Sequence, residues 1–242
     1  MKALVVGGSS GIGLSIVLQL VQDATVEQVY VIDKSIFPKE YLNCRIIIYY
    51  CDLSMGDYSV LKDIDEIQAL FITVGFGHLR WFQNLSEDYI DASFAVNAIA
   101  PIRIIRHYYD KMLSNNVFYC AVMVSIAGRL SSPLFSVYSA TKAALSKFIE
   151  AVNVELDVQG SCNRILEVSP GSVKGTGFTG GVSQPELTAE LAAEIVEYTK
   201  KRKMLFIPKY KDVYKDVIER YHTDAHKFGV ESYWYKKNQG RL

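Results

Sequence analysis

The sequence lacks the features that mark several classes of protein. Its four cysteines form no Cys-x-x-Cys pair and have no nearby histidine to pair with, so we expect free thiols in a reducing compartment and no metal site. The longest apolar stretch, Ala98 to Ile105, is interrupted by Pro101 and Arg103 and is too short to span a bilayer. No signal peptide is expected, because the first residues enter a strand-like run directly, without a charged segment and a long apolar stretch. We therefore expect a cytoplasmic protein without a membrane partner.

The formal net charge of the chain is zero, because 26 Lys and Arg residues balance 26 Asp and Glu residues. A neutral chain has no electrostatic reason to bind nucleic acid or an anionic membrane, so we expect neither as a partner. Apolar residues make up 50% of the 242 positions, enough for a large buried core. This length is within the range of a single α/β domain.

Short strand-like runs alternate with helical stretches along most of the chain. The expected strands are Ala3–Val6, Gln28–Ile32, Arg45–Tyr50, Ala69–Val74, Val117–Val124, Arg164–Val168 and Met204–Ile207, and the expected helices are Ile12–Gln22, Glu87–Leu113, Ser136–Gln159 and Pro185–Lys200. Several runs are continuously apolar, as in parallel strands that are buried on both faces. The alternation predicts one α/β domain over residues 1–242, a Rossmann-type doubly wound parallel sheet with helices on both faces.

Residues 210–242 stand outside this alternation and are charged and aromatic. Their aromatic and histidine side chains, Tyr221, His222, His226, Trp234 and Tyr235, are compatible with a site. We favour the other interpretation, a helical C-terminal extension that packs on the domain or on a partner subunit.

A glycine-rich turn joins the first strand to the first helix. In Gly7-Gly8-Ser9-Ser10-Gly11-Ile12-Gly13, Gly7 permits a tight turn, Gly11 lets the backbone approach a pyrophosphate, and Gly13 lets helix and strand pack closely. The amides and dipole of the helix N-terminus then hold the phosphates. An ordinary glycine-rich turn is the alternative, but the strand before it, the helix after it and the acid described next favour a dinucleotide site.

Asp33 follows Gly13 by 20 residues, at the end of the second strand. A carboxylate there can accept hydrogen bonds from the adenosine ribose and repels a 2′-phosphate, so NAD is expected rather than NADP, although Lys34 could meet a phosphate. After the third strand, Asp52 and Leu53 are placed to contact adenine, and a turn-capping role for Asp52 is an equally good account.

Catalytic side chains are expected between the fifth strand and the helix after it. Tyr138 and Lys142 are four residues apart and share a helix face, and an ammonium beside a phenol lowers the phenol pKa from about 10. Tyr138 could thus act as a general acid and base. Ser125, at the carboxyl end of the fifth strand, could hydrogen-bond the substrate oxygen.

With the glycine turn, Asp33, Ser125, Tyr138 and Lys142 in this order, the sequence resembles the short-chain dehydrogenase/reductase family. The resemblance runs from Met1 to about Lys200. The resemblance implies a catalytic role for Ser125, Tyr138 and Lys142, and adds Asn97 as support for a proton-relay water. It also implies that Pro170, Gly171 and Val173 lie beside the nicotinamide. The residues expected at the cofactor are therefore Gly7, Ser9, Ser10, Gly11, Ile12, Gly13, Asp33, Asp52, Leu53, Gly75, Tyr138, Lys142, Pro170, Gly171 and Val173.

The sequence departs from the family pattern in two places. Val6 stands where the family has threonine, and Ile72-Thr73-Val74-Gly75 replaces an Asn-Asn-Ala-Gly run. In the family these polar residues help to tie the central strands to the adenosine side. Their replacement bears on cofactor affinity and leaves the four catalytic residues in place.

The pocket for the substrate is expected from Phe76–Trp81, Ile126–Phe135 and Ser172–Gln184. His78 or Arg80 could bind a polar group or simply belong to a surface loop, and Lys174–Gly181 predicts a short mobile lid in which Phe178 could cover a ligand. We expect an enzyme that transfers a hydride between NAD(H) and a small carbonyl or alcohol substrate. The alternative is a non-catalytic dinucleotide-binding sensor or scaffold. The family resemblance also implies a homodimer or homotetramer formed through the helices Glu87–Leu113 and Ser136–Gln159.

Overall fold

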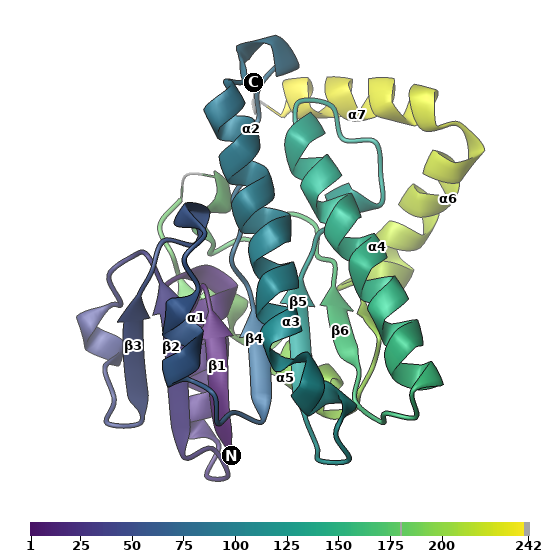
Figure 1. Cartoon of the computed structure of the whole chain (residues 1–242). Helices are drawn as coiled ribbons and strands as arrows, with labels where there is room; N and C mark the ends of the chain where they lie inside the picture. Colours follow the sequence, from purple (N-terminus) through teal and green to yellow (C-terminus); the bar gives the residue numbers. More distant parts are fainter. Residues whose placement is uncertain (180, 240–242) are drawn as a thin grey trace.

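A seven-stranded parallel sheet forms the centre of the computed structural model, which describes residues 1–179 and 181–239 (Figure 1). Gly180 of the predicted lid and residues 240–242 of the extension lie outside the described residues. The strand order is β3-β2-β1-β4-β5-β6-β7, which confirms the predicted doubly wound fold. The strands are β1 (Lys2–Val6), β2 (Gln28–Asp33), β3 (Ile46–Tyr50), β4 (Ala69–Ile72), β5 (Tyr119–Met123), β6 (Ile165–Val168) and β7 (Leu205–Phe206).

Helices cover both faces of the sheet, as the continuously apolar strands require (Figure 1). One core layer joins alternate residues of the strands to Ile104, Tyr108 and Leu145 of α3 and α4. The other joins the remaining strand residues to α1 and α5. The helices are α1 (Gly11–Gln22), α2 (Glu87–Phe94), α3 (Ala100–Leu113), α4 (Ser136–Val158), α5 (Pro185–Lys200), α6 (Lys215–Thr223) and α7 (Ala225–Asn238). Among the described residues, no helix combines the length and apolar character needed to cross a bilayer.

The long helix predicted over Glu87–Leu113 is interrupted. A π-helical turn, Ala95–Ile99, separates α2 from α3 and places Asn97 in the core. Pro101 explains the interruption, because it has no N–H with which to close an α-helical hydrogen bond onto the Asn97 carbonyl. π-Turns of this kind are frequent at functional sites.

Thr73 holds the ends of β1 and β4 together. Its hydroxyl lies 3.0 Å from the carbonyl oxygens of both Val6 and Gly7. The replacement of the family's polar residues by Val6 and by the Thr73-Val74 run therefore does not remove the tie between the central strands. A threonine directly after β4, instead of one on β1, makes it.

The C-terminal extension folds into a π-helical turn, Tyr210–Tyr214, followed by α6 and α7. Figure 1 shows α7 at the end of the molecule opposite the N-terminus, above the carboxyl ends of the strands. The extension thus packs on its own chain, at the edge of the sheet where the predicted site lies.

Candidate active site

One large cavity, of about 940 Å³, opens at the carboxyl ends of the strands. Its walls include the glycine turn, the ends of β2 and β3, the loops after β4, β5 and β6, and parts of the extension. Parallel α/β sheets place their ligands at this edge. The predicted site residues on its walls are Gly7, Ser10, Gly11, Ile12, Gly13, Asp33, Asp52, Leu53, Gly75, Ser125, Tyr138, Lys142, Pro170, Gly171 and Val173. The other two, Ser9 and Asn97, are buried behind this surface.

The glycine turn is built as expected around close backbone contacts. A Cβ atom on Gly13 would lie 2.0 Å from the Gly7 carbonyl oxygen, and one on Gly7 would lie 2.7 Å from the Val74 nitrogen, so neither position accepts a side chain. Gly7 has φ of +86° and Gly11 of +53°, the left-handed region that favours glycine.

The N-terminus of α1 is the place where the glycine turn predicts a phosphate site. Its N-cap, Ser10, makes no capping hydrogen bond with its side chain. The Gly11 N–H donates to the Ser183 hydroxyl at 2.7 Å, so a hydroxyl from the loop after β6 already occupies one of its N–H donors. Within residues 1–179 and 181–239, the buried Ser9 hydroxyl has no hydrogen-bond partner. Unpaired buried polar groups are costly, and this one fits a turn that receives a polar ligand.

Asp33 holds the glycine turn from the end of β2. Its carboxylate accepts hydrogen bonds from the Ser9 and Ser35 amides, both at 2.9 Å. Asp52, at the end of β3, accepts hydrogen bonds from the Ser54 amide and hydroxyl, which lower the pKa of its carboxyl. Of the two accounts left open for Asp52, the turn cap is therefore present in the structure, and a contact with adenine remains a prediction.

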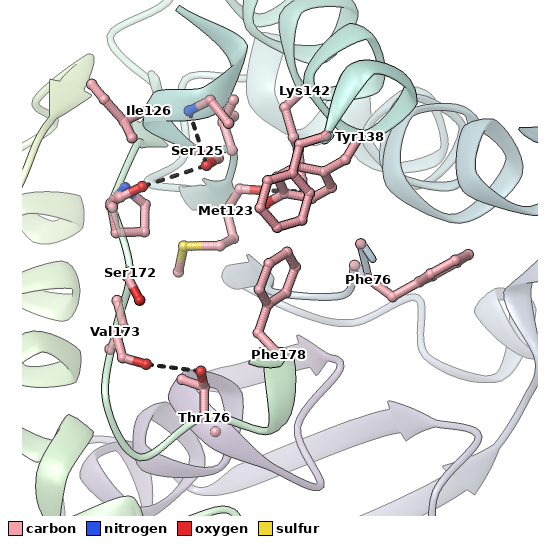
Figure 2. A pocket seen from close by; sticks show the side chains of 18 of the residues that line it. Phe76, Met123, Ser125, Ile126, Tyr138, Lys142, Ser172, Val173, Thr176 and Phe178 are labelled. Atoms are coloured by element: carbon pink, nitrogen blue, oxygen red, sulfur yellow. Dashed lines mark hydrogen bonds between the residues drawn. The ribbon is translucent and has the colours of Figure 1, made fainter. Parts of the chain in front are cut away.

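Ser125 lies where β5 ends and the loop begins, on the cavity wall. Its hydroxyl accepts a hydrogen bond from the Ala127 N–H at 3.1 Å and is 3.5 Å from the Pro170 carbonyl oxygen. Figure 2 shows this hydroxyl and the Tyr138 ring on neighbouring parts of the same pocket. The loop after β5 and the start of α4 thus bring these two residues together across 13 positions of sequence.

Tyr138 and Lys142 are both buried at the start of α4, on one face as predicted. The Lys142 ammonium group donates a hydrogen bond to the Met123 carbonyl oxygen at 2.9 Å and lies 5.9 Å from the centre of the Tyr138 ring. Burial lowers the pKa of Lys142 to about 7.

The expectation that Lys142 lowers the pKa of Tyr138 is wrong in this structure. Burial raises the pKa of Tyr138 to about 12, and the Ser125 hydroxyl counteracts only part of that effect. Desolvation dominates because a buried phenolate loses its hydration, while the ammonium group points to a backbone carbonyl instead of the phenol oxygen.

Asn97 is hydrogen-bonded to the backbone of the loop after β4, and its part in a proton relay stays a prediction. Its amide accepts a hydrogen bond from the Phe76 N–H at 2.9 Å and donates to the Phe76 carbonyl at 2.8 Å. A further contact at 3.2 Å joins it to the Thr141 hydroxyl on α4. A Cβ atom on Gly75 would lie 3.1 Å from the Lys142 nitrogen and 3.2 Å from the Asn97 oxygen. Gly75 therefore leaves the room in which Asn97 and Lys142 approach each other.

Comparison with known proteins places this architecture in a family. Residues 1–187 match the family described as short chain dehydrogenase. The chain belongs to this family. It is 30% identical over 210 residues to the uncharacterized oxidoreductase TDA5 of Saccharomyces cerevisiae, an alignment that covers 81% of this chain and 64% of that protein. The chain thus spans just under two thirds of this relative's length.

Solved structures of short-chain dehydrogenases share the fold. One from Burkholderia phymatum, in complex with NAD, has a TM-score of 0.78 at 18% identity and covers 92% of this chain and 93% of its own. Another from Burkholderia cenocepacia, in complex with NADP, has a TM-score of 0.75 at 18% identity and covers 96% of both chains. The likeness at this identity concerns the fold.

Phe178, the large apolar residue of the predicted lid, lies against Tyr138. Its ring lies beside that of Tyr138 (Figure 2), with ring centres 5.1 Å apart. The ring centre of Phe135 is 6.0 Å away. The lid segment includes a short 3-10 turn, Gly177–Thr179. That Phe178 covers a bound ligand stays a prediction.

The two polar residues expected in the loop after β4, His78 and Arg80, line different cavities. His78 lines the cavity and stacks on Tyr89, with ring centres 5.4 Å apart. Arg80 lies instead on a separate, smaller cavity with Trp81 and Asn84. Of the two, His78 is thus the one placed to face a ligand of the main cavity.

Sequence reasoning missed the part that the extension plays in the cavity. Of the five residues singled out there, Tyr235 is the one on the cavity wall. Tyr214, Val217 and Phe228 also line it, although no motif pointed to them. The density of aromatic residues after Tyr210 was the available signal, but an aromatic surface helix gives the same pattern.

Proposed function

We propose that this short-chain dehydrogenase is an NAD(H)-preferring oxidoreductase that interconverts a carbonyl compound and the corresponding alcohol. The observation that carries the proposal is the convergence of Ser125, Tyr138 and Lys142 with the glycine turn on the walls of one cavity. A protein that only bound a dinucleotide would have no chemical need for a buried tyrosine and lysine beside that turn.

The chain's own residues supply the proton and orient the substrate. When bound, the nicotinamide supplies or takes up the hydride, and its oxidised form adds a positive charge that favours the phenolate. The Tyr138 hydroxyl, with its pKa near 12, is protonated at neutral pH and is ready to give its proton to a carbonyl oxygen. Ser125 holds that oxygen, and Lys142, with its pKa near 7, can exchange a proton at neutral pH.

Asp33 supports the preference for NAD over NADP. Its carboxylate lies on the cavity wall at the end of β2, hydrogen-bonded to the glycine turn. A negative charge at this place repels a 2′-phosphate and can accept hydrogen bonds from ribose hydroxyls.

The test is a NADH and NADPH oxidation screen over a panel of aldehydes and ketones. Tyr138→Phe should keep NADH binding while turnover falls by roughly 10²–10⁴, the usual contribution of a positioned acid. Tyr109→Phe is the matched control, because Tyr109 lies on α3 and its hydroxyl accepts a hydrogen bond from Gln159 on the outer surface. Near-normal turnover by Tyr138→Phe would remove this residue from the role. Tight NADH binding without turnover on the whole panel would favour the sensor or scaffold.

A homodimer or homotetramer through α3 and α4 is part of the proposal. Val154 and Val158 on α4 expose 60% and 83% of their surface, which gives this helix apolar groups that a second copy could bury. Light scattering at micromolar concentration should show more than one chain per particle, and a monomer would remove this part of the proposal.

A cytoplasmic location is proposed from the state of the cysteines. Cys44, Cys51, Cys120 and Cys162 are all free, and Cys44 and Cys162 are exposed. Exposed thiols persist where the compartment is reducing. Fractionation of cells that express the chain should find it with cytoplasmic markers, and recovery with membranes would contradict this.

A further inference from the structure

Glu167 brings a carboxylate into the core of the sheet, on a strand whose other residues are apolar. Strand β6 runs Ile165-Leu166-Glu167-Val168, and all four residues are buried. Glu167 exposes only 4% of its surface. Burying a carboxylate removes its hydration, and replacing a buried ion pair by apolar residues of similar volume is often neutral or stabilising. Stability alone is therefore a weak reason for a charge at this position.

Three segments of the chain donate hydrogen bonds to this carboxylate. Arg129, in the loop after β5, donates to its Oε1 atom from two nitrogens, at 2.6 and 3.1 Å. The Ser169 hydroxyl, directly after β6, donates to the same oxygen at 2.7 Å. The Ser146 hydroxyl on α4 donates to the Oε2 atom at 3.0 Å. We call these four residues the Glu167 network, in which both oxygens of the carboxylate have partners.

Arg129 attaches the network to the loop that carries Ser125. Ser125 begins the 3-10 turn Ile126–Gly128, and Arg129 ends it. A Cβ atom on Gly128 would lie 2.7 Å from the Lys142 carbonyl carbon, so this turn rests directly on α4. A shift of Arg129 therefore moves the turn that presents the Ser125 hydroxyl.

The two serines attach the network to the other segments of the predicted site. Ser146 is buried on α4, one helical turn beyond Lys142. Ser169 directly precedes Pro170, and the Pro170 carbonyl accepts a hydrogen bond from the Ile126 N–H at 3.0 Å. The network thus joins the loop after β5, the helix α4 and the turn after β6 at one carboxylate.

The ion pair lies behind the site and acts through the residues that it holds. The described residues that line the cavity include Ala127 and Leu130 but neither Arg129 nor Glu167. Glu167 is thus not placed to touch a substrate or a cofactor. What the network can govern is the distance between groups on the three segments. A displacement of about 1 Å in such groups can lower a rate by about 10²-fold.

We propose that Glu167 and Arg129 are positioning residues, and that their ion pair holds Ser125 at the distance from Tyr138 that proton transfer requires. Charge-assisted hydrogen bonds are directional, and a buried polar network whose members are all paired rigidifies the segments that it joins. An apolar pair of the same size would fill the space without fixing a direction. The proposal rests on the proposed function, because the reaction that it serves is the one proposed for Tyr138.

The test replaces the ion pair by two methionines, Arg129→Met with Glu167→Met. Arg129→Met alone leaves the Glu167 carboxylate buried without its ion pair, so it should lower the urea midpoint of unfolding. The double variant should recover the midpoint, because two apolar side chains of similar length fill the same space. A role in stability alone would restore turnover together with the midpoint.

Turnover separates positioning from stability. The assay uses NADH and the aldehyde or ketone that the intact protein reduces fastest. In the double variant kcat should stay roughly 10–100-fold below that of the intact protein although stability has recovered. The Kd of NADH in fluorescence titrations should not change, because the glycine turn lies between β1 and α1, outside the network.

Hydrogen exchange followed by mass spectrometry measures the same effect without any substrate. The amides of residues 126–129 all donate hydrogen bonds within the loop or to the Pro170 carbonyl. In the double variant these amides should exchange about tenfold faster, while those of β1 and α1 exchange as before.

A matched control lies at the other ends of the same two elements. Asp157, near the end of α4, forms an ion pair with Arg164, directly before β6. Asp157→Met with Arg164→Met also removes an ion pair between α4 and the β6 segment, but it should leave kcat and the exchange of residues 126–129 unchanged. If the Glu167 double variant does not fold, Ser146→Ala removes one hydrogen bond on α4. It should lower kcat by about fivefold and speed the same exchange.

The outcomes separate this proposal from the proposed function. Recovery of both stability and turnover in the double variant would overturn the positioning role, because filling the space would then be all that the pair does. Unchanged exchange of residues 126–129 would overturn it as well. Faster exchange confined to these residues, in a protein whose intact form reduces no carbonyl, would remove the proposed function and leave the hold of the network on the Ser125 loop standing.

Discussion

Replacing Lys142 by methionine should make the stability of this protein less dependent on pH above neutrality. Lys142 exposes only 2% of its surface, and burial lowers its pKa from 10.5 to about 7. Between these two values the unfolded chain binds a proton at this lysine that the folded chain does not bind. The free energy of unfolding of the intact protein therefore rises with pH through this window, by about 1.4 kcal/mol per pH unit.

Methionine cannot ionise, so the variant lacks this contribution at every pH. From pH 7.5 to 9.5 the free energy of unfolding of the intact protein should rise relative to that of Lys142→Met by about 2.7 kcal/mol. The lost hydrogen bond to the Met123 carbonyl adds an offset that does not change with pH in this range. Other titrating groups are common to both proteins and cancel in the difference.

Urea denaturation followed by circular dichroism at pH 7.5, 8.5 and 9.5 measures this difference. Lys147→Met is the matched control, because Lys147 lies on α4 with 78% of its side chain exposed, and its difference should stay within about 0.5 kcal/mol. A Lys142→Met difference that is flat or that falls with pH would refute the reasoning, since burial of the ammonium group would then not govern its protonation.

Three further predictions concern the cofactor end of the cavity. Thr73→Val should lower the free energy of unfolding by about 1–2 kcal/mol through the hydrogen bonds lost from β1, whereas no change in urea denaturation would mean that this hydroxyl does not tie the strands. Asp33→Ala should shift the ratio of NADH to NADPH affinity toward NADPH by roughly tenfold in fluorescence titrations, and an unchanged ratio would argue against the ribose role. Ser183→Ala should tighten NADH binding by roughly threefold, because an anion no longer competes with this hydroxyl for the Gly11 amide; weaker binding would show that the hydroxyl assists the cofactor.

Local sequence patterns determined much of this protein. The apolar runs specified parallel strands buried on both faces, and the strand order followed the doubly wound arrangement that such alternation produces. Tyr138 and Lys142 share a face because four residues make about one helical turn. The glycine turn could also be predicted from the sequence. The contacts that forbid side chains at Gly7 and Gly13 arise within one short segment and the strand beside it.

Contacts between distant segments could be decided only by the tertiary structure. Thr73 replaces a threonine expected at position 6, because either strand can supply the hydroxyl once the two strands lie side by side. The raised pKa of Tyr138 depends on burial by surrounding elements, which outweighs the lysine one turn away. Tyr214 rests on Gly171 across 43 positions, and no periodicity encodes such an approach. Spacing along the chain fixes which side chains share a face, whereas desolvation and close packing depend on what the rest of the chain places around them.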